Sequence, residues 1–211
     1  MLLYNEIRTL SDEYEKRLKS QMDAREIEMK EDDLSHFILY QVLGISADEG
    51  HKIDLYQNKG RFLYKYAGSF LESATKSCII HKFPTAKTTT IPNTIGHRPK
   101  NFEIDCLADT GEAFEIKWRD ATTDGDHITK EHTRIQVIAK AGYKPVRIMF
   151  YYPNRSQAIR IQKTLETLYQ GIGGEYHFGD AAWKYINDYT GVDLIGIIKT
   201  IAEEKKRAKG Q

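Results

Sequence analysis

The hydrophobic pattern changes its period near residue 80, and this change limits the possible fold more than any other feature of the chain. Before it, apolar residues recur every three or four positions, which is the spacing of amphipathic helices. After it come short runs in which apolar and polar residues alternate, as they do in half-buried strands. A chain with both periods is expected to fold as a mixed α/β domain with helices packed on a sheet.

Two helices are expected within the first 43 residues, and a third from about 61 to 78. The expected strands are 78–83, 101–107, 113–118 and 146–151. The expected later helices are 124–142, 156–169, 181–188 and 193–208. Residues 84–100 hold three of the five prolines and a run of threonines, so this segment is predicted to be a loop.

The two central strands are predicted to form a hairpin, because Asp109-Thr110-Gly111 between them is a turn signal closed by glycine. Alternation in 101–107 puts Asp105 on the face opposite the apolar residues. In an antiparallel pair Asp105 can face Glu115, and Lys117 projects from the same face as Glu115. Three polar side chains are therefore expected to converge on one face of the sheet.

Two carboxylates at that separation suit a hard divalent cation, typically Mg²⁺, which keeps several waters and also takes phosphate oxygens as ligands. A neighbouring ammonium can orient an attacking water and offset charge that grows on a phosphate. The alternative is a solvated sheet face with a Glu-Lys pair. The Glu-x-Lys spacing also occurs three more times, in charged helical stretches, so it is not specific by itself.

With the order helix, strand, strand, helix, strand, the residues Asp105, Glu115 and Lys117 resemble the PD-(D/E)xK nuclease motif. The whole chain, in size and organisation, resembles an orthodox type II restriction endonuclease. The shared pattern covers roughly 61–151, and Ile104 stands where the motif would have its proline. That proline is the least functional element of the motif, so its absence has little bearing on the resemblance.

The resemblance implies Mg²⁺-dependent hydrolysis of DNA that leaves a 5′-phosphate and a 3′-hydroxyl. Asp105 and Glu115 would hold the Mg²⁺, and Lys117 would position and help activate the water. Members of the superfamily often place one more carboxylate on the helix before the sheet. Glu72 corresponds to that position as a further catalytic and metal-binding residue, although a solvent-facing helical glutamate would look the same.

The expected fold is thus an α/β PD-(D/E)xK, restriction-endonuclease-like core. It has a small mixed central sheet flanked by helices, and helical N- and C-terminal extensions. We expect one nuclease domain over 1–211. Within it, 1–50 is a helical dimerisation segment, 61–151 is the catalytic core and 152–211 holds the C-terminal helices.

Two segments have side chains suited to DNA. The first follows the catalytic strand, and its candidates are Arg119, Asp120, Thr122, Thr123, Asp124, Asp126, His127, Lys130 and Arg134. A helix N-terminus capped by an aspartate, with a solvated polar face, is the alternative interpretation. The second is the loop 84–100, because long loops are often functional. Its candidates are Lys87, Asn93, His97, Arg98 and Lys100.

The formal net charge of +1 argues against a nucleic-acid partner only until the charges are located. Residues 1–50 carry 6 basic and 12 acidic side chains, whereas residues 51–100 carry 9 basic and 2 acidic ones. This asymmetry is compatible with a basic DNA-facing side, and equally with an acidic helical segment packed beside a basic one.

Composition excludes other classes. The chain has no apolar stretch long enough for a membrane span, and its first residues lack the order of a signal peptide. Two cysteines support neither a disulfide framework nor a structural zinc site. We therefore expect a cytoplasmic prokaryotic protein with reduced cysteines.

The leading hypothesis is a homodimeric, sequence-specific DNA endonuclease, because two active sites related by two-fold symmetry can cut both strands of a palindrome. A cognate DNA methyltransferase would then protect the cell's own sites without being a physical partner. The alternatives are a structure-specific repair or recombination nuclease, and a non-catalytic DNA-binding module whose carboxylates are solvated.

Overall fold

The computed structural model describes residues 2–119 and 125–210, and the chain divides into two compact units. The helical unit is Thr9–Phe70, and the α/β unit is Met1–Arg8 together with Leu71–Gln211. The sequence predicts one domain with a helical segment that ends near residue 50. In the structure the helical unit continues to residue 70.

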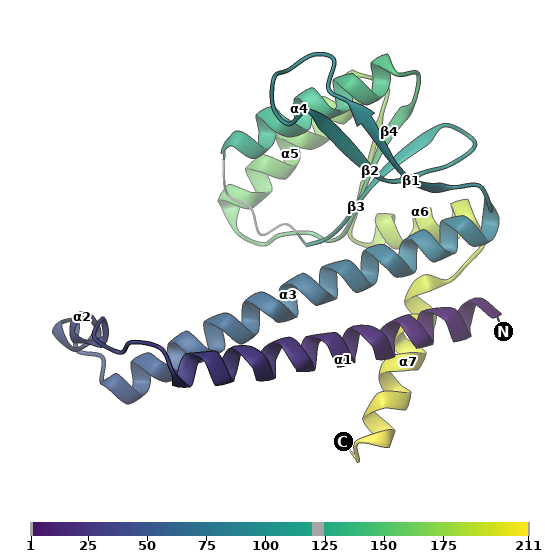
Figure 1. Ribbon diagram of the computed structural model, residues 1–211. Helices are drawn as coiled ribbons and strands as arrows, with labels where there is room; N and C mark the ends of the chain where they lie inside the picture. Colours follow the sequence, from purple (N-terminus) through teal and green to yellow (C-terminus); the bar gives the residue numbers. More distant parts are fainter. Residues whose placement is uncertain (1, 120–124, 211) are drawn as a thin grey trace. The chain divides into compact units, whose positions relative to one another are not determined.

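The helical unit contains most of α1 (Leu2–Lys30), all of α2 (Phe37–Val42) and the larger part of α3 (Ala47–Lys82). The long helices α1 and α3 lie side by side (Figure 1). Between them Tyr14 meets the ring edges of Tyr66 and Phe70, and Lys59 pairs with Glu26 at 2.8 Å. The two helices predicted before residue 43 are therefore present, while the third begins 14 residues earlier than predicted.

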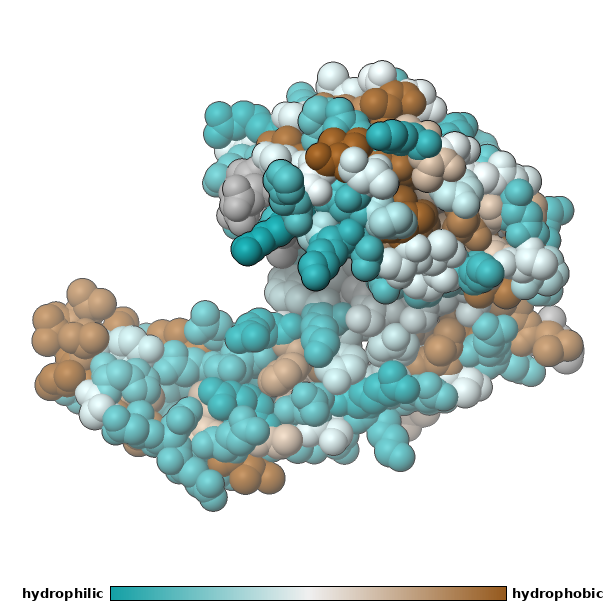
Figure 2. Space-filling view, turned by 45° about the horizontal axis from the view of Figure 1, so that its top comes forward, coloured by the Kyte–Doolittle hydropathy of each residue, from teal (hydrophilic) through white to brown (hydrophobic). Residues whose placement is uncertain are grey.

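The end of the helical unit around α2 exposes large apolar side chains. Figure 2 shows them as a hydrophobic patch, which we call the α2 patch. It comprises Leu34, Ile38, Leu39, Val42 and Leu43. Val42 and Leu43 are 77% and 78% exposed, which is unusual for aliphatic residues that stand together.

The strand predicted for 78–83 is wrong, because residues 78–82 form the end of α3. Cys78 and Ile79 are fully buried whereas Ile80 is exposed, and Leu71, Ala74 and Cys78 continue one helical stripe. A short apolar run does not distinguish a strand from a buried helical segment by its periodicity alone. Cys78 and Cys106 are both free and buried, as predicted.

The α/β unit contains a five-stranded mixed sheet in the order β1-β2-β3-β4-β5. Its strands are β1 (Lys87–Pro92), β2 (Asn101–Leu107), β3 (Glu112–Arg119), β4 (Lys144–Tyr151) and β5 (Glu175–Phe178). The first three strands pair antiparallel, and β3, β4 and β5 pair parallel. The predicted mixed α/β class with a small mixed sheet is confirmed at this level.

Two strands of the sheet differ from the sequence prediction. The prolines of 84–100 predict a loop, yet its threonine run forms β1, because β-branched residues suit an edge strand and Pro92 lies at the strand's end. The four-residue strand β5 has no counterpart in the prediction. The predicted hairpin of β2 and β3 and the predicted strand β4 are confirmed.

Helices cover both faces of this sheet. The helices α4 (Gly125–Lys140) and α5 (Ser156–Gly171) lie on one face and α6 (Asp180–Thr190) on the other (Figure 1). The last helix, α7 (Leu194–Ala208), is capped by Asp193, which accepts a hydrogen bond from the Gly196 N–H at 3.0 Å. The predicted C-terminal helices are thus present with nearly the predicted bounds.

The two faces of the sheet have separate cores. On the α4 side, one cluster comprises Ile91, Phe102, Ile104, Ala113, Val137 and Ile138. A second cluster, also involving α4, comprises Ile135, Ile161, Leu165, Tyr169 and Tyr176. On the α6 side, Phe114 packs against the rings of Tyr185 and Tyr189. Successive β3 residues therefore point into different cores.

The pairing of β1 with β2 is irregular beside Asp105. The pairing of β1 with β2 shifts between Lys87 and Thr89, where two steps along β1 match three along β2. Because of the extra residue, simple alternation ends there, and residues 104–106 are all buried. The strict alternation by which the sequence places Asp105 opposite Ile104 therefore does not continue through Asp105, which is buried like both its neighbours.

Candidate active site

The site begins where β2 and β3 separate. Their pairing consists of Cys106 with Phe114 and Leu107 with Ala113, and Asp105 and Glu115 would be the next pair. The strands diverge there, and the Ile116 backbone N–H donates to Asp105 Oδ2 at 2.7 Å. The Asp105 side chain therefore accepts a hydrogen bond at the point where the strand pairing ends.

The structure brings together the three side chains predicted from the hairpin. Lys117 Nζ lies 2.5 Å from Glu115 Oε1 and 3.8 Å from Asp105 Oδ2. Asp105 and Glu115 are only 7% and 4% exposed, so the site is a buried acidic pair with one lysine. This geometry excludes the alternative of a solvated sheet face.

Burial controls the charges of the site. Burial, together with the nearby Glu115 carboxylate, raises the pKa of Asp105 to about 6. Burial alone would lower the pKa of Lys117, but the carboxylates of Glu115 and Asp105 outweigh it and raise that pKa. Lys117 therefore remains an ammonium at neutral pH, and it can donate hydrogen bonds but cannot act as a base.

A helix contributes a second cation to the site. Arg134 of α4 places Nη1 2.5 Å from Glu115 Oε2 and 3.7 Å from Glu131 Oε2. Its Nη2 donates to the Glu103 backbone oxygen. The Arg134 side chain is only 15% exposed. Arg134 is predicted from the sequence to contact DNA, whereas in the structure it lies against the two glutamates.

Next to Arg134 lies a buried network of charged and polar side chains that was not predicted from the sequence. Glu131 Oε1 lies 3.1 Å from Arg147 Nη1 and accepts a 2.6 Å hydrogen bond from the Tyr169 hydroxyl. Arg147 is 1% exposed. Burial would raise the pKa of Glu131, but Arg147 and Arg134 more than offset it and lower that pKa. Glu131 and the two arginines are therefore ionised at neutral pH, and Arg134 lies within reach of the Glu131 carboxylate.

The sequence did contain a signal for this network. Ile128 and Ile135 belong to the predicted apolar stripe of α4, and Glu131 lies between them on the same helical face. Arg147 likewise interrupts an apolar strand. A charge on a core face requires a partner, so these two residues could have been paired with each other from the sequence.

One buried oxygen of the site has no hydrogen bond. Glu115 Oε2 is close to Arg134, yet no donor among the described residues is aligned with it. The Nε atoms of Arg134 and Arg147 are also without hydrogen bonds. An unsatisfied buried carboxylate oxygen is costly, and a hard cation is one partner that would satisfy it.

Glu72 is close enough to act on this site through its charge. It raises the pKa of Asp105, although less than burial and Glu115 do. Its carboxylate pairs with Lys76 at 3.1 Å, and Lys76 Nζ lies 3.4 Å from the Thr88 hydroxyl. The described residues include no group of three or more acidic, histidine or cysteine side chains arranged to hold a metal. Metal binding by Glu72 therefore stays a prediction.

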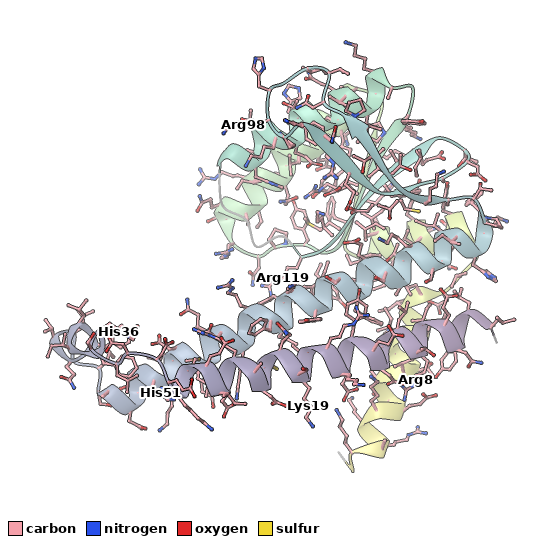
Figure 3. All side chains as sticks on the ribbon, viewed as in Figure 1. Arg8, Lys19, His36, His51, Arg98 and Arg119 are labelled. Atoms are coloured by element: carbon pink, nitrogen blue, oxygen red, sulfur yellow. The ribbon has the colours of Figure 1, made fainter. Side chains whose placement is uncertain are left out.

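The predicted DNA-contacting residues of the first segment have different surroundings. Arg119, at the end of β3, and Lys130, on α4, are exposed, while His127 is half-buried (Figure 3 labels Arg119). The other candidates, Asp120, Thr122, Thr123 and Asp124, lie outside the described residues, as does the side chain of Asp126.

The second segment presents an exposed basic surface on β1 and its connection to β2. Its exposed members are Lys87, His97, Arg98 and Lys100 (Figure 3 labels Arg98). Asn93 instead organises the connection, because it donates to the Pro99 oxygen at 2.9 Å and accepts from the Gly96 N–H at 2.8 Å. Its side chain is used within the loop.

The mixed α/β fold thus carries a buried acidic pair with one lysine, and its carboxylate oxygens are of the kind that could hold a divalent cation. The chain belongs to the ApaLI-like restriction endonuclease family, whose model matches residues 1–203. It is therefore of a nuclease family of hydrolases whose substrate is DNA. No curated protein and no solved structure is significantly similar to it. In the part of the chain that the structure describes, no helix is long and apolar enough to span a membrane.

Proposed function

We propose that this chain is a type II restriction endonuclease that cuts both strands of DNA at a specific sequence and requires Mg²⁺. The observation that carries the proposal is the convergence of Asp105, Glu115 and Lys117 where β2 and β3 separate. Family membership supports the nuclease activity. The α/β unit would then be a PD-(D/E)xK core.

Asp105 and Glu115 would hold the Mg²⁺. Both offer carboxylate oxygens, the donors that this ion prefers, and waters and phosphate oxygens would complete its shell. Glu115 Oε2 supports this assignment, because it makes no hydrogen bond and has only the ion pair with Arg134, a contact that a metal ion could replace. When bound, the ion would polarise the phosphate and offset the negative charge that develops during the reaction.

Lys117 would orient the attacking water. Its ammonium is held by both carboxylates and stays protonated, so it would donate to the water and to the phosphate. The water oxygen attacks phosphorus and loses a proton to solvent, while the bond from phosphorus to the 3′-oxygen breaks. That oxygen takes up a proton, so the products are a 5′-phosphate and a 3′-hydroxyl.

DNA would be contacted by the exposed basic side chains around β1 and after β3. Lys87, Arg98 and Lys100 can bind phosphates, while Arg119 and Lys130 come from the segment that follows the catalytic strand. The acidic helical segment balances these cations in the total charge. The formal charge of +1 is thus compatible with a DNA substrate.

The helical unit would form the homodimer. Cutting both strands of a palindromic site requires two active sites related by a two-fold axis. The α2 patch supports a contact there, because an exposed apolar cluster of this kind is typical of an interaction surface. A cognate DNA methyltransferase in the same cell would protect the host's own sites.

Digestion of a long defined DNA, with and without Mg²⁺, tests this function when the ends of the products are sequenced. Discrete fragments with a common end sequence are expected, only with Mg²⁺. Nicking confined to junctions or flaps would instead indicate a structure-specific repair nuclease. Intact DNA at high enzyme excess would contradict both and favour a non-catalytic DNA-binding module.

A further inference from the structure

Glu115 lies between two cations in the structure. Lys117 Nζ is 2.5 Å from Oε1, and Arg134 Nη1 is 2.5 Å from Oε2. Both oxygens of a proposed metal ligand are therefore already next to a positive charge. A divalent cation that binds Glu115 has to replace at least one of these contacts.

Arg134 is the cation better placed to leave. Its contact with Oε2 is an ion pair without hydrogen-bond alignment, whereas its Nη2 donates to the Glu103 backbone oxygen. A second acid is within reach, because Glu131 Oε2 lies 3.7 Å from Nη1. Arg134 can thus turn from Glu115 to Glu131 while its charge stays paired.

The charge of the cluster gives a reason for this exchange. Asp105, Glu115 and Glu131 carry three negative charges when ionised, and Lys117, Arg134 and Arg147 carry three positive ones. A divalent cation on Glu115 would lie next to the Arg134 guanidinium, in a mostly buried region where like charges repel strongly. Metal entry should therefore displace Arg134 from Glu115 Oε2, and Glu131 is the acid that can keep the arginine paired.

We infer that Arg134 competes with the divalent cation for Glu115 and so weakens metal binding by the free protein. This inference rests on the proposed function, because it takes Glu115 as a metal ligand. Arg134 acts here through Glu115, which makes it a positioning residue. It holds the Glu115 carboxylate in place before the metal binds, and it is displaced toward Glu131 when the metal enters.

Binding of Mn²⁺ alone, without DNA, tests the inference, with free Mn²⁺ measured by electron paramagnetic resonance. Replacing Arg134→Gln should lower the half-saturating Mn²⁺ concentration about tenfold or more, since an ion pair to a buried carboxylate is lost from the competition. Lys140→Gln is the matched control. It removes the same charge from an exposed position on the same helix, so it should change the affinity less than about twofold.

A further variant, Arg134→Lys, provides a test that does not depend on the folding of Arg134→Gln. Arg134→Lys retains the positive charge but lacks the planar guanidinium with its several N–H donors. Its affinity for Mn²⁺ should therefore lie between those of the native protein and Arg134→Gln. Thermal unfolding of each variant identifies any that does not fold. If Arg134→Gln does not fold, Arg134→Lys carries the test, and an affinity equal to the native value would overturn the inference.

The outcomes separate this inference from the proposed function. If the native protein binds Mn²⁺ and Glu115→Gln abolishes that binding, the metal site stands. An Arg134→Gln variant that binds Mn²⁺ no more tightly than the native protein would then overturn the role of Arg134 alone. Absence of Mn²⁺ binding in both the native protein and Arg134→Gln would overturn the metal site and the inference together.

Discussion

The helical unit and the α/β unit place their charged and apolar side chains in opposite ways. In the helical unit, ion pairs such as Arg17 with Glu13 are exposed, while the α2 patch places aliphatic side chains in solvent. In the α/β unit, Glu131 and Arg147 are buried among apolar clusters. Exposed pairs contribute little to stability, whereas breaking a buried pair is costly. The same kind of substitution should therefore have very different effects in the two units.

The largest expected effect concerns the site of the α/β unit. Asp105→Asn should slow DNA cleavage by about 10³-fold, because a proposed metal ligand loses its charge while its shape is kept. Asp109→Asn, the same substitution at an exposed position in the hairpin turn, should leave the rate nearly unchanged. Single-turnover cleavage of a DNA that the native enzyme cuts measures both rates. Equal cleavage rates for the two variants would show that Asp105 is not an active-site residue.

The next largest effect concerns the stability of the α/β unit. Glu131→Gln should lower the free energy of unfolding by roughly 3–5 kcal/mol, because Arg147 would remain buried without a counter-charge. Urea unfolding at pH 7 measures the difference. A loss below about 1 kcal/mol would mean that the network is not a stability element.

The same network predicts a pH dependence. The pKa of Glu131 is lower in the folded protein than its ordinary value of 4.5, because Arg147 and Arg134 outweigh the opposing effect of burial. A lowered folded-state pKa stabilises the protein above pH 4.5, and this contribution is lost as the pH falls below that value toward the folded-state pKa. Urea unfolding between pH 3 and pH 7 should therefore show a smaller acid-induced loss for Glu131→Gln than for the native protein.

A smaller effect is expected for the α2 patch of the helical unit. Val42→Glu should weaken the proposed homodimer about tenfold, because it places a charge within an apolar contact. Gln41→Glu adds the same charge to the same helix without removing an apolar group, so it should weaken the dimer much less than Val42→Glu does. Sedimentation equilibrium of both variants compares their dissociation constants. A dimer unaffected by Val42→Glu would place the interface elsewhere.

The smallest effect on stability is expected for an exposed ion pair of the helical unit. Glu13→Gln removes one partner of an exposed i,i+4 pair in the helical unit and should change the free energy of unfolding by less than about 0.5 kcal/mol. Urea unfolding under the conditions used for Glu131→Gln makes the two values comparable. A Glu13→Gln effect as large as that of Glu131→Gln would contradict the proposed difference between exposed and buried charges.

Much of the fold follows from local patterns. The hairpin of β2 and β3 is predicted within a residue of its bounds, because alternation and a glycine turn are local signals. The errors occur where a short segment is compatible with two structures. Residues 78–83 have an apolar run that continues α3, and the threonines of β1 lie between prolines that suggest a loop. In both cases tertiary contacts determined the outcome.

The sequence by itself determined the mixed α/β class and the grouping of Asp105, Glu115 and Lys117, because both depend on spacing within one hairpin. Only the tertiary structure decided that this group is buried and that Arg134 lies against Glu115, with Glu131 and Arg147 behind it. The physical reason is distance along the chain. Helix and strand periods are local, whereas the pairing of buried charges joins α4 to β3 and β4 and depends on how the helix packs on the sheet.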